Sequence, residues 1–315
     1  MGVWDYIKNS GDHPGSAQYA LDWVGAIPGK RESRRFVGDY VLRQEDIQSG
    51  RIFQDQVAYG GWWLDLHPPM GIDAKNEQPC VQHHLDHLYS IPMRCLYSRN
   101  VRNLFFAGRN ISATHVAFAS TRVMATCAVM GQAIGTAAAL CLGSGPGVSI
   151  RRNLTPKAVG NLQQTLLRDD VFLLGVGNED PLDLARGSKV SASSGSGTAE
   201  SVVNGVTRNL QGAWGCWAQD SANGWQSETV PAWMELALAG EAAVSEIHVT
   251  FDSGLGRELM LTPSGLQSMA GRRVGFICTG QLFAKASAPS GKAGQGAPRQ
   301  AGDPRYARSF LGTGF

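Results

Sequence analysis

The stretch NLFFAGRNISATHVAFASTRVMATCAVMGQAIGTAAALCL, residues 103–142, carries the strongest indication of the fold. It begins with the short apolar run Leu104–Ala107, which is typical of a buried strand. The run ends at Gly108 and Arg109, and a polar loop then leads to a helix-forming segment that begins near Ser120. A strand, a glycine turn and a helix start together present backbone N–H groups, so this order predicts a site for an anionic or electron-rich ligand.

The charges at the expected helix start bear on this site. Ser120 or Thr121 is suited to cap the helix by accepting a backbone N–H. Arg122 has the wrong sign for a helix N-terminus, where the dipole is positive and acidic residues are favoured. No acidic residue lies between Arg109 and Leu142. Either a bound electron-rich group compensates this charge, or Arg122 reaches solvent or pairs with a carboxylate elsewhere in the chain.

The helix interior has two interpretations. Val123–Leu142 is a run of twenty residues without a charge, long enough to cross a membrane, and Gly131 and Gly135 form a small-xxx-small pair. However, the run is mostly Ala, Gly, Thr and Cys, with Gln132 in the middle, so its apolar surface is thin for a lipid-facing helix. The small residues recur at helical spacing, at positions 125, 128, 131, 135 and 138. We therefore expect a buried helix packed on a sheet, and no membrane span.

These segments resemble the C-terminal flavin-contacting part of the FAD-dependent oxidoreductase family. The resemblance covers about the first 150 residues and keeps the family's order of motifs. The matching segments are PGKRESRRFVGDYVL (28–42), the pair Asp46-Ile47, YGGWWLDLHPPMGI (59–72), YSIPMRCL (89–96), NLFFAGRNIS (103–112) and STRVMATCAVMGQAIGTAAA (120–139). The resemblance implies an α/β fold, a partial FAD/NAD(P)-binding-type domain, with FAD as the cofactor.

The same resemblance implies which residues hold the cofactor. In this family the Ala-Gly-Arg turn approaches the FAD, and the N-terminus of the following helix faces the pyrimidine edge of the flavin. The residues carried over to this role are Gly108, Arg109, Ser120, Thr121, Arg122, Val123 and Met124. A fixed cation and a helix dipole at this edge would stabilise the negative charge of a reduced flavin.

Three residues are candidates for catalysis. His115 lies between the glycine turn and the expected helix start, where an imidazole can take a hydroxyl proton while a hydride passes to the flavin. Arg31 or Arg34, in the basic cluster of residues 30–35, is suited to hold a substrate oxygen anion. The same cluster also fits a solvated loop or strand face.

The sequence lacks the motif that holds the ADP part of FAD in this family. That motif is a strand, a GxGxxG loop and a helix. Neither GxGxxG nor GxxxxGK[ST] occurs in the 315 residues. We therefore expect the chain to be the C-terminal part of a longer enzyme, and the polypeptide alone to bind FAD poorly and to be inactive.

The histidines outside this stretch give weaker indications. His83 and His87, in HHLDH, have the i, i+4 spacing of helical metal ligands. Pro79 and Pro92 bracket them, and no Glu follows as in HExxH, so we predict no metal site. His67 follows WWLDL, and its Asp-x-His spacing fits either a substrate pocket or a packed strand with a satisfied histidine.

The second half of the chain has a different character. Thr155–Asp170 predicts a helix, with Thr155 as its cap and Pro156 at its first position. The segments KVSASSGSGTAESVVNGVTR (189–208) and PAWMELALAGEAAVSEIHVTFDS (231–253) then resemble discoidin-like, galactose-binding-type modules. We expect an incomplete all-β jelly-roll-like sandwich, with Ile247, Val249 and Phe251 on one face of its last strand.

These observations divide the chain into four parts. The expected parts are residues 1–150, the C-terminal part of an FAD-dependent oxidoreductase domain; 151–182, a helical linker; 183–262, the partial sandwich; and 263–315, a disordered tail. Trp214, Trp217 and Trp225 either stack on sugar rings or anchor the core of the sandwich.

The expected function is hydride transfer to FAD from a small-molecule, carbohydrate-derived substrate. The alternative is a non-catalytic carbohydrate- or surface-binding protein with a relic flavin domain. The net charge of +2 gives no field for nucleic-acid binding. The first fifteen residues lack a signal-peptide pattern, the six cysteines form no CxxC motif, and neither the compartment nor the oligomeric state follows from the sequence.

Overall fold

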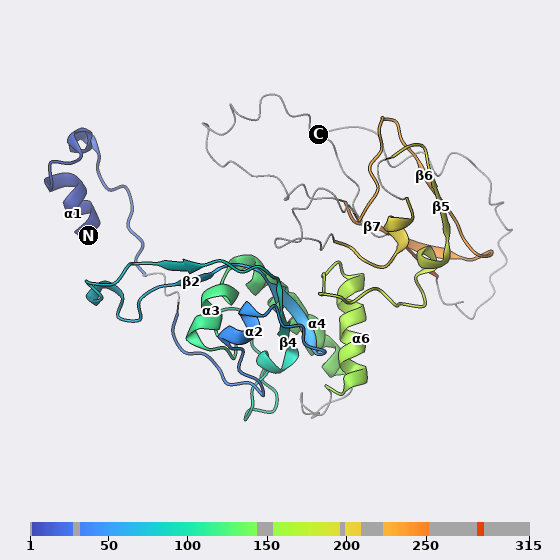
Figure 1. The fold of residues 1–315 in the computed structure, drawn as a ribbon, viewed down its shortest axis with the longest axis horizontal. Helices are drawn as coiled ribbons and strands as arrows, with labels where there is room; N and C mark the ends of the chain where they lie inside the picture. The colour runs from blue at the N-terminus through green and yellow to red at the C-terminus, as the bar shows by residue number, and fades with distance from the viewer. Residues whose placement is uncertain are drawn as a thin grey trace. The chain divides into compact units, whose positions relative to one another are not determined.

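The computed structural model describes residues 2–27, 32–143, 154–195, 199–208 and 223–251, and the backbone of 282–286 (Figure 1). Residues 1–33 and 34–315 form two compact units. In the first unit, helix α1 (Gly2–Asn9) is followed by the 3-10 helix η1 (Pro14–Gln18). Lys8 joins the two helices, because its ammonium group donates to the carbonyl oxygens of Ser16, Ala17 and Tyr19 at 2.9–3.0 Å.

The second unit combines helices with short strands. Its helices are α2 (Gln44–Gln48), α3 (His115–Thr121), α4 (Met124–Gly143) and α6 (Pro156–Arg168), with 3-10 helices η2 (Gly71–Asp73), η3 (Met93–Cys95), η4 (Leu184–Gly187) and η5 (Ala199–Val203). Its strands are β1 (Gln56–Gly60), β2 (Leu64–Leu66), β3 (Val81–His83), β4 (Tyr89–Pro92), β5 (Lys189–Ala192), β6 (Met234–Ala237), β7 (Val244–Val249) and β8 (Leu282–Ala286). Among the described residues, the strands form the antiparallel pairs β1–β4, β2–β3, β5–β6 and β7–β8. Mixed helices and small antiparallel sheets agree with the expected α/β class.

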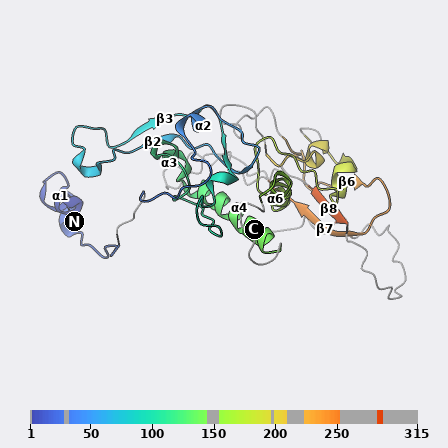
Figure 2. The ribbon, with the colours of Figure 1, turned by 90° about the horizontal axis from the view of Figure 1, so that it is seen from below.

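The main hydrophobic core lies around the β1–β4 pair. Tyr89 and Ile91 of β4 and Val57 of β1 are fully buried. Helices α4 and α6 both contact β1 and each other, and Figure 2 shows the two helices next to one another. Met130 of α4 and Leu166 of α6 are fully buried in the same cluster. The core therefore joins strands that precede residues 103–123 in the sequence to helices that follow them.

The predicted strand at Leu104–Ala107 is wrong as a regular strand. Phe105 forms an isolated antiparallel bridge with Tyr97. Two further backbone hydrogen bonds, from Ser98 to Leu104 and from Phe106 to Leu96, hold the segment beside residues 96–98. This pairing ends after a few residues, because the chain turns at Gly108 with a φ of +86°.

The single helix that was expected to begin near Ser120 is two helices. Helix α3 begins at His115, and its N-cap is Thr114, whose side chain accepts from the Ala117 N–H at 3.3 Å. Arg122 is the C-cap of α3, and α4 begins at Met124. Ser120 and Thr121 therefore end a helix and do not cap one, because the earlier Thr114 already supplies the cap.

The expected packing of α4 through its small residues is also wrong. The fully buried residues of α4 are Thr126, Met130, Ala133 and Ala137. Positions 125, 128, 131 and 135 are exposed, and a Cβ added at Gly131 or Gly135 would meet no atom within 4 Å. The face with the larger side chains fills the core against β1. Within the described part of the chain, α4 alone is long and apolar enough to cross a membrane, and length and composition alone establish no span.

The helix predicted at residues 155–170 is confirmed as α6. Thr155 caps it by accepting from the Ala158 N–H at 3.2 Å, and Pro156 opens the first turn. Val159, Leu162 and Leu166 lie in the core, as their spacing predicted.

A second, smaller core follows. It is built from Ala185, Val202, Val203 and Trp225. Trp225 is 7% exposed, and its indole N–H donates to the Ser194 carbonyl at 2.6 Å, so it anchors this core. Trp214 and Trp217 lie outside the described residues.

Strands β7 and β8 pair with each other, but the described residues do not form a closed sandwich. Ile247 and Val249 alternate along β7, as expected for one face, Phe251 follows the strand, and all three side chains are exposed among the described residues. Of the tail expected at 263–315, only β8 is described. The boundaries at 150, 182 and 262 stay predictions.

Candidate functional site

The glycine turn has the conformation that the sequence implied. Gly108 has a φ of +86°, which side chains on other residues rarely tolerate, and a Cβ there would meet nothing within 4 Å. The surface over the turn is therefore open. Arg109 is exposed at this surface. Burial raises the pKa of the Cys127 thiol in α4, and the charge of Arg109 opposes part of that rise. The turn and the start of α4 thus lie close together.

The polar loop after the turn is held by backbone pairing with an earlier segment. Leu42 donates to the carbonyl of Ser112 and accepts from Thr114, at 3.0 and 2.9 Å. Phe36 donates to the carbonyl of Asn110 at 2.9 Å. Residues 36–42 therefore set the position of the loop and of the start of α3.

The three candidate catalytic residues have different environments. His115 is half-buried at the first position of α3. Arg34 is exposed, and Arg31 lies outside the described residues. The guanidinium of the neighbouring Arg35 lies 6.0 Å from the ring centroid of Phe118 in α3. The end of the basic cluster therefore lies beside the helix that carries His115.

Ser120 is buried and bonded on both sides by protein groups. Its hydroxyl donates to the carbonyl of Trp62, so the 2.7 Å hydrogen bond to Tyr89 must be donated by the Tyr89 phenol. Burial raises the pKa of Tyr89 well above its usual range. Ser120 therefore fixes the end of α3 against residues 62 and 89 and does not point at open space.

The other residues of the α3–α4 junction are differently placed. Thr121 is buried, and its Oγ1 has no hydrogen-bond partner among the described residues. Val123 is half-buried, whereas Met124 is 89% exposed. The junction thus combines an unsatisfied hydroxyl, a turn of backbone and an exposed apolar side chain.

Arg122 has a counter-charge that lies far away in the sequence. Its side chain is only 9% exposed, and its Nη2 lies 2.5 Å from Oδ2 of Asp65 and 3.0 Å from the Asp65 carbonyl. Asp65 belongs to β2, 57 residues earlier. Of the two interpretations of Arg122, the structure has the pairing with a distant carboxylate, so this charge alone no longer requires a bound ligand.

The residues present fit the flavin end of FAD. The turn at Gly108 is open, and three buried atoms nearby in sequence lack hydrogen-bond partners among the described residues: Asn110 Oδ1, Ser112 Oγ and Thr121 Oγ1. Buried polar atoms are normally satisfied, so such a group is a candidate to meet a ligand's polar atoms. No glycine-rich loop for the ADP part occurs in the sequence.

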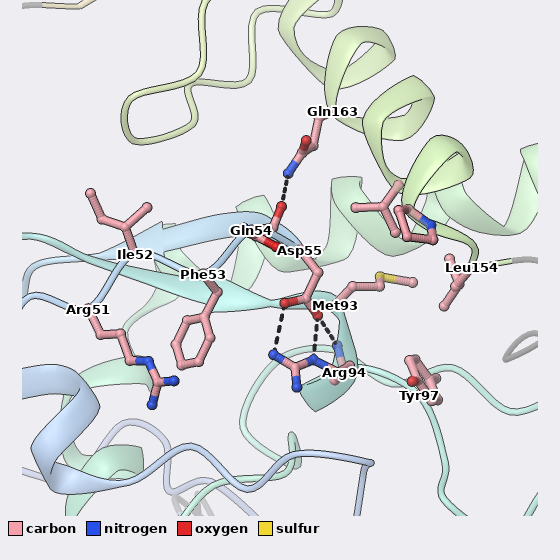
Figure 3. A pocket seen from close by; sticks show the side chains of 12 residues that line it. Arg51, Ile52, Phe53, Gln54, Asp55, Met93, Arg94, Tyr97, Leu154 and Gln163 are labelled. Atoms are coloured by element: carbon pink, nitrogen blue, oxygen red, sulfur yellow. Dashed lines mark hydrogen bonds and ion pairs between the residues drawn. The ribbon is translucent and has the colours of Figure 1, made fainter.

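A cavity of about 690 Å³ is lined by residues of three segments, 51–55, 93–97 and 154–163 (Figure 3). Its wall includes a bidentate ion pair in which Arg94 donates to Asp55 at 2.9 and 3.1 Å. Gln163 of α6 donates to the carbonyl of Gln54 at 2.9 Å. None of the sequence-predicted site residues lines this cavity, so it does not extend the predicted flavin site.

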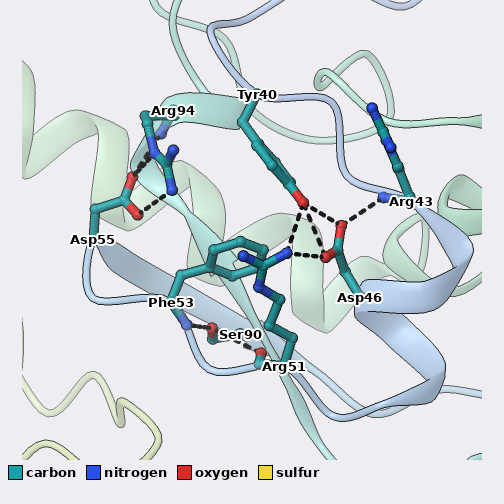
Figure 4. A network of polar contacts seen from close by, with 8 residues as sticks. All are labelled: Tyr40, Arg43, Asp46, Arg51, Phe53, Asp55, Ser90 and Arg94. Atoms are coloured by element: carbon teal, nitrogen blue, oxygen red, sulfur yellow. Dashed lines mark hydrogen bonds and ion pairs between the residues drawn. The ribbon is translucent and has the colours of Figure 1, made fainter.

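A polar network explains the Asp46-Ile47 motif (Figure 4). Asp46 is buried and accepts from the Tyr40 phenol at 2.8 and 2.9 Å, from the Arg43 N–H at 3.0 Å and from Arg51 at 2.9 Å. Burial, then the hydrogen bond to Asp46, raises the pKa of Tyr40. The carboxylate caps α2 and bonds to Tyr40 before the helix and to Arg51 after it. Sequence reasoning missed Tyr40 and Arg51, although both lie within six residues of Asp46, because no known motif marks them as its partners. It missed Asp55 because its partner, Arg94, is 39 residues away.

His83 and His87 do not lie in a helix. Strand β3 ends at His83, and His84 stacks on Trp63 with ring centroids 3.7 Å apart. Trp63 in turn stacks on Trp62 at 6.0 Å. The aromatic residues therefore pack along the β2–β3 hairpin.

Comparison with known proteins gives one match. The family model described as FAD dependent oxidoreductase matches residues 1–166. The comparisons with curated proteins and with solved structures found no match. The matched range contains the turn, the loop, the α3–α4 junction and α6 up to its last turn.

Proposed function

Since the chain belongs to the FAD dependent oxidoreductase family, we propose that it contributes the flavin-facing half of a site in which a hydride passes from an alcohol-type substrate to FAD. The family implies FAD as the cofactor and flavin-linked redox activity. FAD, when bound, supplies the hydride acceptor. The observation that carries the proposal is the open, positive-φ turn at Gly108 beside the α3–α4 junction.

The flavin end would be held by Gly108 and Arg109 on one side and by residues 120–124 on the other. The Thr121 hydroxyl, which has no partner among the described residues, is the group we assign to a polar atom of the ring. Ser120 supports the junction from behind through Trp62 and Tyr89. Arg122 contributes positive charge that Asp65 largely balances.

The proposed proton acceptor is His115. It is half-buried at the start of α3, and the loop that precedes it is fixed by Leu42. Its imidazole would take the substrate hydroxyl proton as the hydride leaves the same carbon. Arg31 or Arg34 would hold the resulting oxygen. For Arg34, the contact of the neighbouring Arg35 with Phe118 supports a position near α3.

The substrate class rests on the second half of the chain. We propose a carbohydrate-derived substrate, because residues 183–262 resemble a discoidin-like, galactose-binding-type module. Within this range, the antiparallel pair β5–β6 is compatible with such a module. Trp225 is an anchor of the small core and so gives no support to a separate, non-catalytic sugar-binding role.

Flavin reduction tests the proposal. The full chain, saturated with FAD without oxygen, would be mixed with a panel of sugar alcohols and aldoses, and bleaching of the flavin absorbance followed. His115→Gln should slow reduction by about 10²–10⁴-fold, the usual contribution of a general base. His248→Gln, an exposed histidine on β7, is the matched control and should leave the rate unchanged. The role of His115 is tested where the unchanged chain reduces flavin at a measurable rate, and an equal rate for the His115 variant would then remove that role. A chain that never quenches flavin fluorescence, even at high FAD concentration, would remove the flavin site.

A further inference from the structure

The β2–β3 hairpin brings together three side chains that the reaction does not use. In the antiparallel register Asp65 lies opposite Gln82, and Leu66 opposite Val81, so the next positions, His67 and Cys80, also face each other. A carboxylate oxygen of Asp65, a ring nitrogen of His67 and Sγ of Cys80 all lie within 4.8 Å of one another. An oxygen, a nitrogen and a sulfur donor converge on one point.

The tautomer of His67 directs a lone pair at this point. Its Nδ1 lies 2.9 Å from the carbonyl oxygen of Pro79, and a carbonyl oxygen only accepts, so Nδ1 carries the proton. In the neutral ring Nε2 is therefore an acceptor. Nε2 is buried although the side chain as a whole is 41% exposed, and it has no hydrogen-bond partner among the described residues. A ring N–H on a backbone carbonyl is the arrangement that orients metal-binding histidines.

Nε2 of His67 faces another electron-rich atom. Oδ2 of Asp65 lies 3.5 Å away. Two lone pairs at this distance repel unless a cation lies between them. The guanidinium of Arg122 bonds Oδ2 and the Asp65 carbonyl, and it thereby fixes the carboxylate with Oδ1 toward Cys80. The Cys80 thiol donates to that Oδ1.

We propose that Asp65, His67 and Cys80 bind a divalent cation of the zinc class. The ligands would be Oδ1 of Asp65, Nε2 of His67 and Sγ of Cys80, a donor set that zinc and cobalt prefer over calcium or magnesium. On binding, the Cys80 thiol loses its proton to solvent and the sulfur–metal bond forms in its place. With three protein ligands, the fourth position is left to water or to a small ligand.

The charge and the geometry are suitable for such an ion. Of the two negative charges on the thiolate and the carboxylate, the Arg122 guanidinium already balances one, so the thiolate supplies the main charge that the ion meets. Tetrahedral ligands at zinc distances lie about 3.3–3.8 Å apart. The three donor atoms lie within 4.8 Å of one another, so rotations of about 1 Å complete the site, and the 2.5 Å contact between Cys80 Sγ and Asp65 Oδ1 opens when the thiol loses its proton. His67 is partly exposed and can make this movement. The site stands on the hairpin's own residues and does not depend on the proposed flavin chemistry.

Cobalt spectroscopy tests the proposal directly. The untagged full chain, freed of metal with EDTA and dialysed, would be titrated with Co²⁺. One equivalent should give a thiolate-to-cobalt band in the near ultraviolet and the visible bands of tetrahedral cobalt, and one equivalent of Zn²⁺ should abolish both. Cys80→Ser should lose the thiolate band, and His67→Gln and Asp65→Asn should weaken Co²⁺ binding by at least about tenfold. Cys141→Ser and His83→Gln are matched controls and should behave like the unchanged chain.

A second measurement needs no variant. Zn²⁺ should protect Cys80 from iodoacetamide, measured peptide by peptide, while the half-buried Cys141 reacts equally with and without the metal. Circular dichroism in EDTA identifies any variant that fails to fold. The proposal is overturned if the folded, unchanged chain shows no thiolate–cobalt band and no protection of Cys80, or if Cys80→Ser gives the same spectrum.

Discussion

Arg122 lies where α3 ends and α4 begins, and its guanidinium is almost fully buried. As a residue in a sequence it is an unfavourable charge near a helix start. In the fold it bonds both the carboxylate and the carbonyl of Asp65, and so it fastens the helix junction to the β2–β3 hairpin. One side chain thus links the proposed flavin site to the proposed metal site.

Removing this guanidinium should destabilise the chain. Arg122→Gln leaves the Asp65 carboxylate without its charged partner, and hydrogen bonds to charged groups contribute about 1.5–3 kcal/mol. We expect the free energy of unfolding, from urea titration, to fall by that amount. Arg102→Gln, an exposed arginine, should change it by less than about 0.5 kcal/mol. Equal effects of the two substitutions would contradict the importance of the pair.

Tyr89 gives a prediction about alkaline pH. Its pKa is raised by burial, so the folded chain keeps the phenol protonated while the unfolded chain ionises it near its ordinary pKa of 10. This contribution to stability is complete below pH 10 and is lost as the pH rises above 10. At pH 8, Tyr89→Phe should cost about 0.5–1.5 kcal/mol, because the hydrogen bond to Ser120 is lost.

The measurement compares urea titrations at pH 8 and above pH 10. The stability advantage of the unchanged chain over Tyr89→Phe should shrink at the higher pH. Tyr19→Phe, at an exposed tyrosine, should show no such change. An advantage that grows with pH would show that the Tyr89 pKa is shifted in the other direction.

At the scale of the element, α4 shows that a pattern of small residues does not identify the packed face. Its core contacts come from Met130, Ala133 and Ala137, whereas Gly131 and Gly135 look onto open space. Substitutions should therefore have opposite effects on the two faces. Gly135→Ala should raise the free energy of unfolding by about 0.5–1 kcal/mol, because alanine favours helix and its Cβ meets nothing.

Ala137→Leu should lower the same free energy by about 1–3 kcal/mol, because the added atoms overpack the core. Thermal unfolding followed by circular dichroism at 222 nm measures both. If Gly135→Ala destabilised the chain, the exposed face of α4 would have a packing partner in solution.

For the whole molecule, the prediction concerns how much of FAD the chain recognises. The family match covers residues 1–166, and the turn and junction fit the flavin ring, but the sequence has no GxGxxG loop for the ADP part. We expect the chain to bind FAD and riboflavin weakly and with affinities within about threefold of each other. That difference in binding free energy is well below the roughly 1.4 kcal/mol that corresponds to tenfold in affinity. Quenching of flavin fluorescence measures both affinities. Much tighter binding of FAD would show that the described residues also recognise the ADP part.

Features encoded by neighbouring residues were predictable. Thr155, Pro156 and the spacing of Val159, Leu162 and Leu166 specify α6 within one helical segment, and the structure confirms it. The turn at Gly108 was also predictable, because a glycine between an apolar run and a polar loop is a strong turn signal, and the structure has φ of +86° there. The helix start was not, because Thr114 and Ser120 are both good caps, and the choice depends on the pairing of Thr114 with Leu42.

The order of several motifs within residues 1–166 was therefore enough to establish the family and the cofactor class. Local pattern also established the glycine turn and the capped helix α6, since each of these depends on residues within about one turn or loop of each other. The partner of Arg122, the buried face of α4 and the meeting of Asp65, His67 and Cys80 came from the folded chain. These three features depend on strand register and on contacts between segments far apart in the sequence. Spacing along the chain carries no record of such contacts, because packing chooses among many pairings that the local pattern allows equally.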